Sequence, residues 1–97
     1  MARYAVERYR NEKMFSVHLD VKVPECGFLV KTDDNGRSFS EKLRGIGGVD
    51  DVSSRGYCVT ITRGGVFTID ELVPKVLEVL KLELGIDSDL EEVKAYS

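Results

Sequence analysis

Residues 14–23 read MFSVHLDVKV, and apolar side chains occupy every second position of the run. The apolar set is Phe15, Val17, Leu19, Val21 and Val23, and the alternate set is Met14, Ser16, His18, Asp20 and Lys22. Because successive side chains of a strand point to opposite sides of a sheet, this pattern predicts a strand with one face on a core. The other face meets water, and we expect His18 to be an ordinary surface histidine there.

The segments around this run predict the rest of a small sheet. Residues 3–10 are also strand-like, with residues 11–13 as the hairpin connection. Residues 28–30 begin a further short extended piece. Residues 49–54 and 57–62 predict two more strands, joined at Arg55-Gly56.

A short helix is expected between these strands. Residues 33–36 read DDNG and predict a turn in which Gly36 is free to adopt a positive φ. Ser38 and Glu41 follow with the spacing of a capping box, and Phe39 begins an apolar repeat of helical period.

A longer helix is expected from Thr68 to about Leu84. Thr68 and Glu71 form a second capping box at its start. Pro74 is deep for a helix that begins there, and Asp70 is an alternative cap that would place the proline in the first turn. The sequence leaves both starts open.

Together these elements predict an α+β fold of order β-β-β-α-β-β-α, a mostly antiparallel sheet with two helices packed on one face. A length of 97 residues indicates one domain, residues 1–97. Residues 86–97 are rich in acidic side chains, and we expect a frayed tail or a short helix there.

Composition narrows the class of protein. The apolar fraction of 42% and the charged fraction of 32% are ordinary for a globular domain. Without a long apolar run or a secretory leader pattern, we expect a cytoplasmic protein that does not bind membranes. The net charge of −3 makes nucleic acid an unlikely partner, because phosphate binding needs a concentrated basic face.

Three segments resemble the N-terminal domain of the Nfu-type iron–sulfur cluster scaffold proteins, which also occurs in a stand-alone form. Residues 39–46 are similar to the short helix of that family, and residues 46–52 to the turn and strand after it. Residues 72–76 resemble its last helix, which also carries a proline early on. The resemblance covers about residues 38–82.

The chain also departs from the family. Residues 8–13 contain no proline where the family has a Pro- and Asn-rich loop, and Ile69 replaces an aromatic residue. The Cys-x-x-Cys motif that holds the cluster in a separate domain of full-length members is absent from this sequence. The resemblance therefore implies a non-enzymatic adaptor that acts through protein contacts in cluster assembly or delivery, as a monomer and without a cofactor of its own.

Two cysteines are candidate binding residues, Cys26 and Cys58. A cytoplasmic setting favours free thiols over a disulfide, and Cys58 is out of phase with the apolar side of its strand. Either residue is a candidate functional thiol, and the alternative is that both are small structural residues. A cluster shared between two chains would need four thiolates.

Two alternatives to the adaptor hypothesis remain open. The acidic pairs at positions 33–34 and 50–51, if close in space, would hold a divalent ion through Asp33, Asp34, Asp50 and Asp51. A sheet with basic and aromatic residues near its start would bind RNA through Tyr4, Arg8, Tyr9 and Arg10. No catalytic motif is evident, so we do not expect an enzyme.

Overall fold

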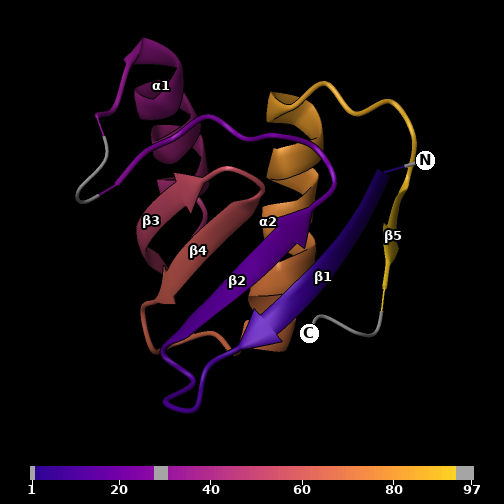
Figure 1. Cartoon of the computed structure of the whole chain (residues 1–97). Helices are drawn as coiled ribbons and strands as arrows, with labels where there is room; N and C mark the ends of the chain where they lie inside the picture. The colour runs from indigo at the N-terminus through magenta and orange to yellow at the C-terminus, as the bar shows by residue number, and fades with distance from the viewer. Residues whose placement is uncertain (1, 28–30, 94–97) are drawn as a thin grey trace.

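Figure 1 shows the computed structural model of the chain, which describes residues 2–27 and 31–93. Within these residues five strands form one sheet in the order β3-β4-β2-β1-β5. The elements are β1 (Ala2–Arg8), β2 (Met14–Leu19), α1 (Asp34–Arg44), β3 (Val49–Arg55), β4 (Cys58–Arg63), α2 (Ile69–Glu83) and β5 (Leu90–Glu92). Both helices lie on one face of the sheet (Figure 1), which confirms the predicted α+β class.

The central strand β2 has the two-sided character that its alternation predicts. It pairs in antiparallel fashion with β1 on one side and with β4 on the other. Phe15 and Val17 are fully buried on the side of the helices, and Leu19 is nearly so. Ser16 and His18 therefore point to the opposite face of the sheet.

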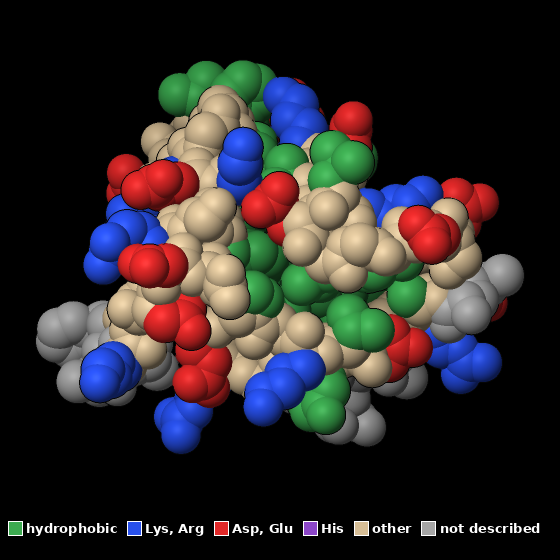
Figure 2. Space-filling model, turned by 90° about the horizontal axis from the view of Figure 1, so that it is seen from above, with side chains coloured by type: hydrophobic (Ala, Val, Ile, Leu, Met, Phe, Trp, Pro, Cys, Tyr) green, Lys and Arg blue, Asp and Glu red, His purple; other side chains and the backbone are tan. Residues whose placement is uncertain are grey.

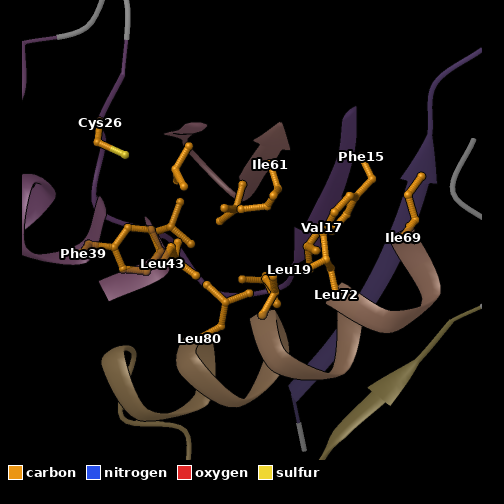
Figure 3. Close-up of a cluster of buried hydrophobic side chains, with 14 residues drawn as sticks. Phe15, Val17, Leu19, Cys26, Phe39, Leu43, Ile61, Ile69, Leu72 and Leu80 are labelled. Carbon is orange, nitrogen blue, oxygen red and sulfur yellow. The ribbon is translucent and has the colours of Figure 1, made fainter. Parts of the chain in front are cut away.

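The core fills the space between the sheet and the helices, as Figure 3 shows. Helix α2 contributes Leu72, Val76 and Leu80 to it, and α1 contributes Phe39 and Leu43. Burial of each such side chain is worth about 1.5–3 kcal/mol, which offsets the roughly 1–2 kcal/mol per residue lost in backbone entropy. The apolar stripes predicted for both helices are thus the faces that pack on the sheet.

The start of α1 differs from the sequence prediction. Asp33 is the N-cap, and its side chain accepts a hydrogen bond from the Gly36 amide at 2.8 Å. The helix therefore begins before Ser38, and Gly36 lies inside it rather than in a turn with positive φ. A side chain at this buried position would collide with the carbonyl oxygen of Glu25. Because glycine has no side chain, the backbone at Glu25 can lie close to the helix.

Helix α2 begins at Thr68, as its capping box predicts. The Thr68 hydroxyl accepts from the Glu71 amide, and the Glu71 carboxylate accepts from the Thr68 amide. The alternative cap at Asp70 is wrong, and Pro74 lies inside the helix. Because proline has no N–H, the backbone carbonyl of Asp70 has no hydrogen-bond donor within the helix. Asp70 is exposed, so water reaches this carbonyl.

Residues 90–92 form a strand, β5, where the sequence predicted a frayed tail or a short helix. This strand is parallel to β1, with Ala2 opposite Leu90 and Tyr4 opposite Glu92. Leu90 packs against the core, which gives the strand an apolar anchor. The observed order is therefore β-β-α-β-β-α-β, and the extra strand expected at residues 28–30 lies outside the described residues.

The hairpin of β3 and β4 is shifted by one residue from the prediction. Its turn is Gly56-Tyr57, with Gly56 at a φ of 63°. Tyr57 was expected in the strand but occupies the turn, where it is 57% exposed.

Neither helix described here is long and apolar enough to cross a membrane.

Replacement of Leu80 by alanine should destabilise the fold far more than the same change at Leu82. Leu80 is fully buried, whereas Leu82, two residues along the same helix, is 75% exposed. We expect Leu80→Ala to lower the free energy of unfolding by about 2–5 kcal/mol and Leu82→Ala to change it by less than about 0.5 kcal/mol. Urea unfolding followed by circular dichroism measures both, and equal losses would contradict the packing of α2.

Candidate functional site

The face of the sheet away from the helices is the candidate functional surface. Figure 1 looks onto this open face, with α2 behind it. The strand registers place two rows of residues side by side across it. The first row is Glu7, Ser16, Thr60 and Ser53, and the second is Ala5, His18, Cys58 and Arg55.

Hydrogen bonds join the hydroxyl groups of the first row. The Ser16 hydroxyl lies 2.7 Å from the Tyr9 hydroxyl and 2.9 Å from that of Thr60. Ser16 is fully buried although neither of the two described helices covers this face. Tyr9, which follows β1, therefore folds back over the sheet. Its hydroxyl and that of Thr60 give the buried Ser16 hydroxyl the hydrogen-bond partners that a buried polar group needs.

His18 is hydrogen-bonded to Glu7 on the neighbouring strand. Its Nε2 lies 2.8 Å from the Glu7 Oε1, and the two side chains are 18% and 36% exposed. An ionised carboxylate only accepts, so Nε2 carries the proton and Nδ1 holds the lone pair in the neutral ring. His18 is therefore a half-buried, oriented imidazole rather than the ordinary surface histidine that was expected.

The structure separates the two cysteines. Cys26 is buried on the helix side, where its thiol lies 3.1 Å from the Ser54 hydroxyl and its backbone pairs with that of Ser54. Cys58 is half-buried on the open face. The two thiols point to opposite sides of the sheet, so they do not form one binding site within the chain.

Two of the four aspartates of the divalent-ion hypothesis serve other contacts. Asp33 caps α1, and Asp51 forms an ion pair with Arg44 at 2.8 Å. In the part of the chain that the structure describes, no group of three or more His, Cys, Asp or Glu side chains is arranged to hold a metal ion. The geometry therefore does not bring Asp33, Asp34, Asp50 and Asp51 together as a metal site.

The residues of the RNA hypothesis do not share one face. Tyr4 packs against the core, and burial together with the Glu92 carboxylate raises the pKa of its phenol. Arg8 forms an ion pair with Asp70 at the start of α2, while the Tyr9 hydroxyl is bonded to Ser16. Figure 2 views the end of the molecule opposite the β1–β2 turn, where basic and acidic side chains are interspersed. A stacking platform of Tyr4, Arg8, Tyr9 and Arg10 is not assembled.

The outer edge of β3 is protected against pairing with another strand. Ser54 already exchanges two backbone hydrogen bonds with Cys26, at 3.1 and 2.9 Å. The Val52 amide donates to the Asp51 carboxylate at 2.9 Å, and Arg44 holds that carboxylate in place. The opposite edge, β5, is only three residues long. Short or capped edges of this kind are poor templates for strand addition.

Three residues of this surface were not among the candidate site residues of the sequence analysis, namely Glu7, Thr60 and Arg55. Their positions follow from strand register, which no single segment of the sequence specifies. The predicted turn at residues 11–13 would pair Glu7 with Val17, whereas the observed register pairs it with Ser16 and places it diagonal to His18. Comparison with protein-family models, with curated proteins and with solved structures finds no match to this chain.

The hydrogen bond to Glu7 predicts the tautomer of His18. Because the chain has one histidine, its ring nitrogens give unambiguous NMR signals. We expect the neutral ring to carry its proton on Nε2, and Glu7→Ala to redistribute it toward the Nδ1 form. Long-range proton–nitrogen spectra measure this, with Glu78→Ala on α2 as the matched control. An Nδ1–H tautomer in the unmodified chain would contradict the observed geometry.

Proposed function

We propose that this chain is a non-enzymatic adaptor that contributes protein contacts in iron–sulfur cluster assembly or delivery. Support comes from the segments that resemble the Nfu N-terminal domain. They fold as α1, the turn after it, the β3–β4 hairpin and α2, in the expected order. In this proposal the chain acts as a monomer in the cytoplasm and needs no cofactor of its own.

The open face of the sheet is the contact surface in this proposal, and the observation that carries it is that neither helix of the described residues covers this face. Both helices occupy the other face, and the edges are capped or short. The molecule measures 30 × 29 × 24 Å, so one broad face is comparable with the roughly 800 Å² that each partner buries in a standard interface.

The polar character of the open face suits a partner that binds reversibly. Ser16 and Thr60 are bonded to each other and His18 to Glu7, so covering them leaves no buried group unpaired. Arg55 and Tyr57 are exposed at the β3–β4 turn. Arginine and tyrosine are the residue types that most often dominate binding energy in protein interfaces.

Anaerobic affinity purification of the tagged chain from its own lysate tests the proposal. We expect mass spectrometry to show enrichment of cysteine desulfurase, cluster scaffolds or cluster-carrying enzymes. Charge reversal in Arg55→Glu should abolish this enrichment, because it reverses a charge at the turn beside the open face. Arg37→Glu, on the exposed side of α1, is the matched control and should retain the partners.

Two outcomes would contradict different parts of the proposal. If none of these partner classes is enriched, the role in iron–sulfur maturation is wrong. If the partners remain bound to Arg55→Glu, the open face is not the contact surface. Thermal unfolding of both variants confirms that each is folded before its partners are compared.

A further inference from the structure

A cavity of about 390 Å³ lies between α1 and the edge strand β3. Its volume is within the range of roughly 300–1,000 Å³ that small-molecule sites occupy. The two rows of the open face contribute none of its described lining residues, so it is separate from the proposed partner surface. The polar and charged residues that line it include Thr32, Arg37, Ser40, Arg44 and Asp51.

Three of these residues form one stripe along α1. Arg37, Ser40 and Arg44 are spaced by three and then four positions, and residues at these spacings are neighbours on a helix surface. All three line the same cavity. Two guanidinium groups are therefore placed on either side of one hydroxyl, along the wall that α1 gives to the cavity.

The Ser40 hydroxyl is the observation that points to a ligand. Ser40 is only 8% exposed, yet its hydroxyl forms no hydrogen bond with any residue, in the part of the chain that the structure describes. A helical serine can bond back to the carbonyl four residues earlier, and Ser40 does not. Its oxygen is not sealed from solvent, and the residue lines the cavity. Because buried polar groups nearly always have partners, this hydroxyl is placed to bond to something inside the cavity.

Both arginines keep donors for a ligand. Arg44 gives one N–H to the Asp51 carboxylate at 2.8 Å, and a guanidinium has five. Asp51 also accepts from the Val52 amide, so it is compensated and holds Arg44 in position. Arg37 lies 3.7 Å from the carboxylate of Asp34, whose side chain is 99% exposed. Such an exposed pair contributes little and is easily exchanged for another anion.

We propose that this cavity binds a phosphate group, either as the free ion or as the terminal group of a small molecule. Arg37 and Arg44 donate to its oxygens, since the guanidinium fork matches phosphate geometry. The Ser40 hydroxyl donates between them, and the Thr32 hydroxyl is a further donor of the lining. Donors from several directions suit a tetrahedral dianion better than a planar carboxylate, which carries one charge and two oxygens.

Titration of the purified chain, followed by amide NMR spectra, tests the site. The probes are inorganic phosphate and glycerol 3-phosphate, each compared with sodium chloride at the same ionic strength. We expect both phosphates to shift the amide signals of Ser40 and Arg44, and uncharged glycerol to leave them unchanged. Tighter binding of glycerol 3-phosphate would assign the site to a small phosphorylated molecule, and equal binding would assign it to free phosphate. Both results support the phosphate class.

Three substitutions test the named donors. Ser40→Ala should weaken phosphate binding about tenfold, the value of a hydrogen bond to a charged group. It should not lower the midpoint of thermal unfolding, because the hydroxyl bonds to no part of the fold and alanine favours a helix. Arg37→Gln and Arg44→Gln should each weaken binding by about tenfold or more. Lys42→Gln removes an exposed cation from the same helix, outside the lining, and is the matched control that should bind like the unmodified chain.

Three results would each overturn the site. The first is the absence of shifts at Ser40 and Arg44 with both phosphates. The second is unchanged affinity in Ser40→Ala, and the third is equal weakening by Lys42→Gln and Arg44→Gln, which would indicate attraction to the net charge of α1 alone. The assay uses the purified chain, so it is independent of the adaptor proposal. Arg37→Glu should lose phosphate binding while it retains the protein partners, which separates the two.

Discussion

The rest of the structure depends on the two-sidedness of β2. This strand lies at the centre of the sheet, pairs on both sides, and presents Phe15 and Val17 to the helices. Period-two geometry then requires Ser16 and His18 to face the other way. A shift of one residue would bury the polar set and expose the apolar set, so the hydrophobic core fixes the register. The open face is thus a consequence of the core.

The two rows on that face exist because three pairings share this register. β1 brings Glu7 to His18, β4 brings Cys58 beside it, and β3 adds Arg55. Each residue alone is an ordinary polar side chain of a strand. The shared register is what places them next to one another on the open face.

The remaining surfaces are used by the fold itself. Asp33 caps a helix, and Asp51 with Arg44 protects the edge of β3. Gly36 lets the chain around Glu25 lie directly against α1, where any larger residue would collide with it. Side chains that suggested a metal site or an RNA surface therefore have structural duties. These duties leave the open face as the surface that we propose for binding protein partners.

The sequence by itself determined the features that depend on near neighbours along the chain. The alternation of residues 14–23 specified β2, and Thr68 with Glu71 specified the start of α2, because these signals lie within a few residues of one another. Three features required the tertiary structure, namely the approach of Glu25 to Gly36, the β5 strand and the Glu7–His18 pair. The approach depends on how the chain packs onto α1, β5 depends on an uncovered edge of β1, and the hydrogen-bonded pair depends on strand register. Contacts of this kind join segments far apart in the chain, and local propensity carries no record of which segments will meet.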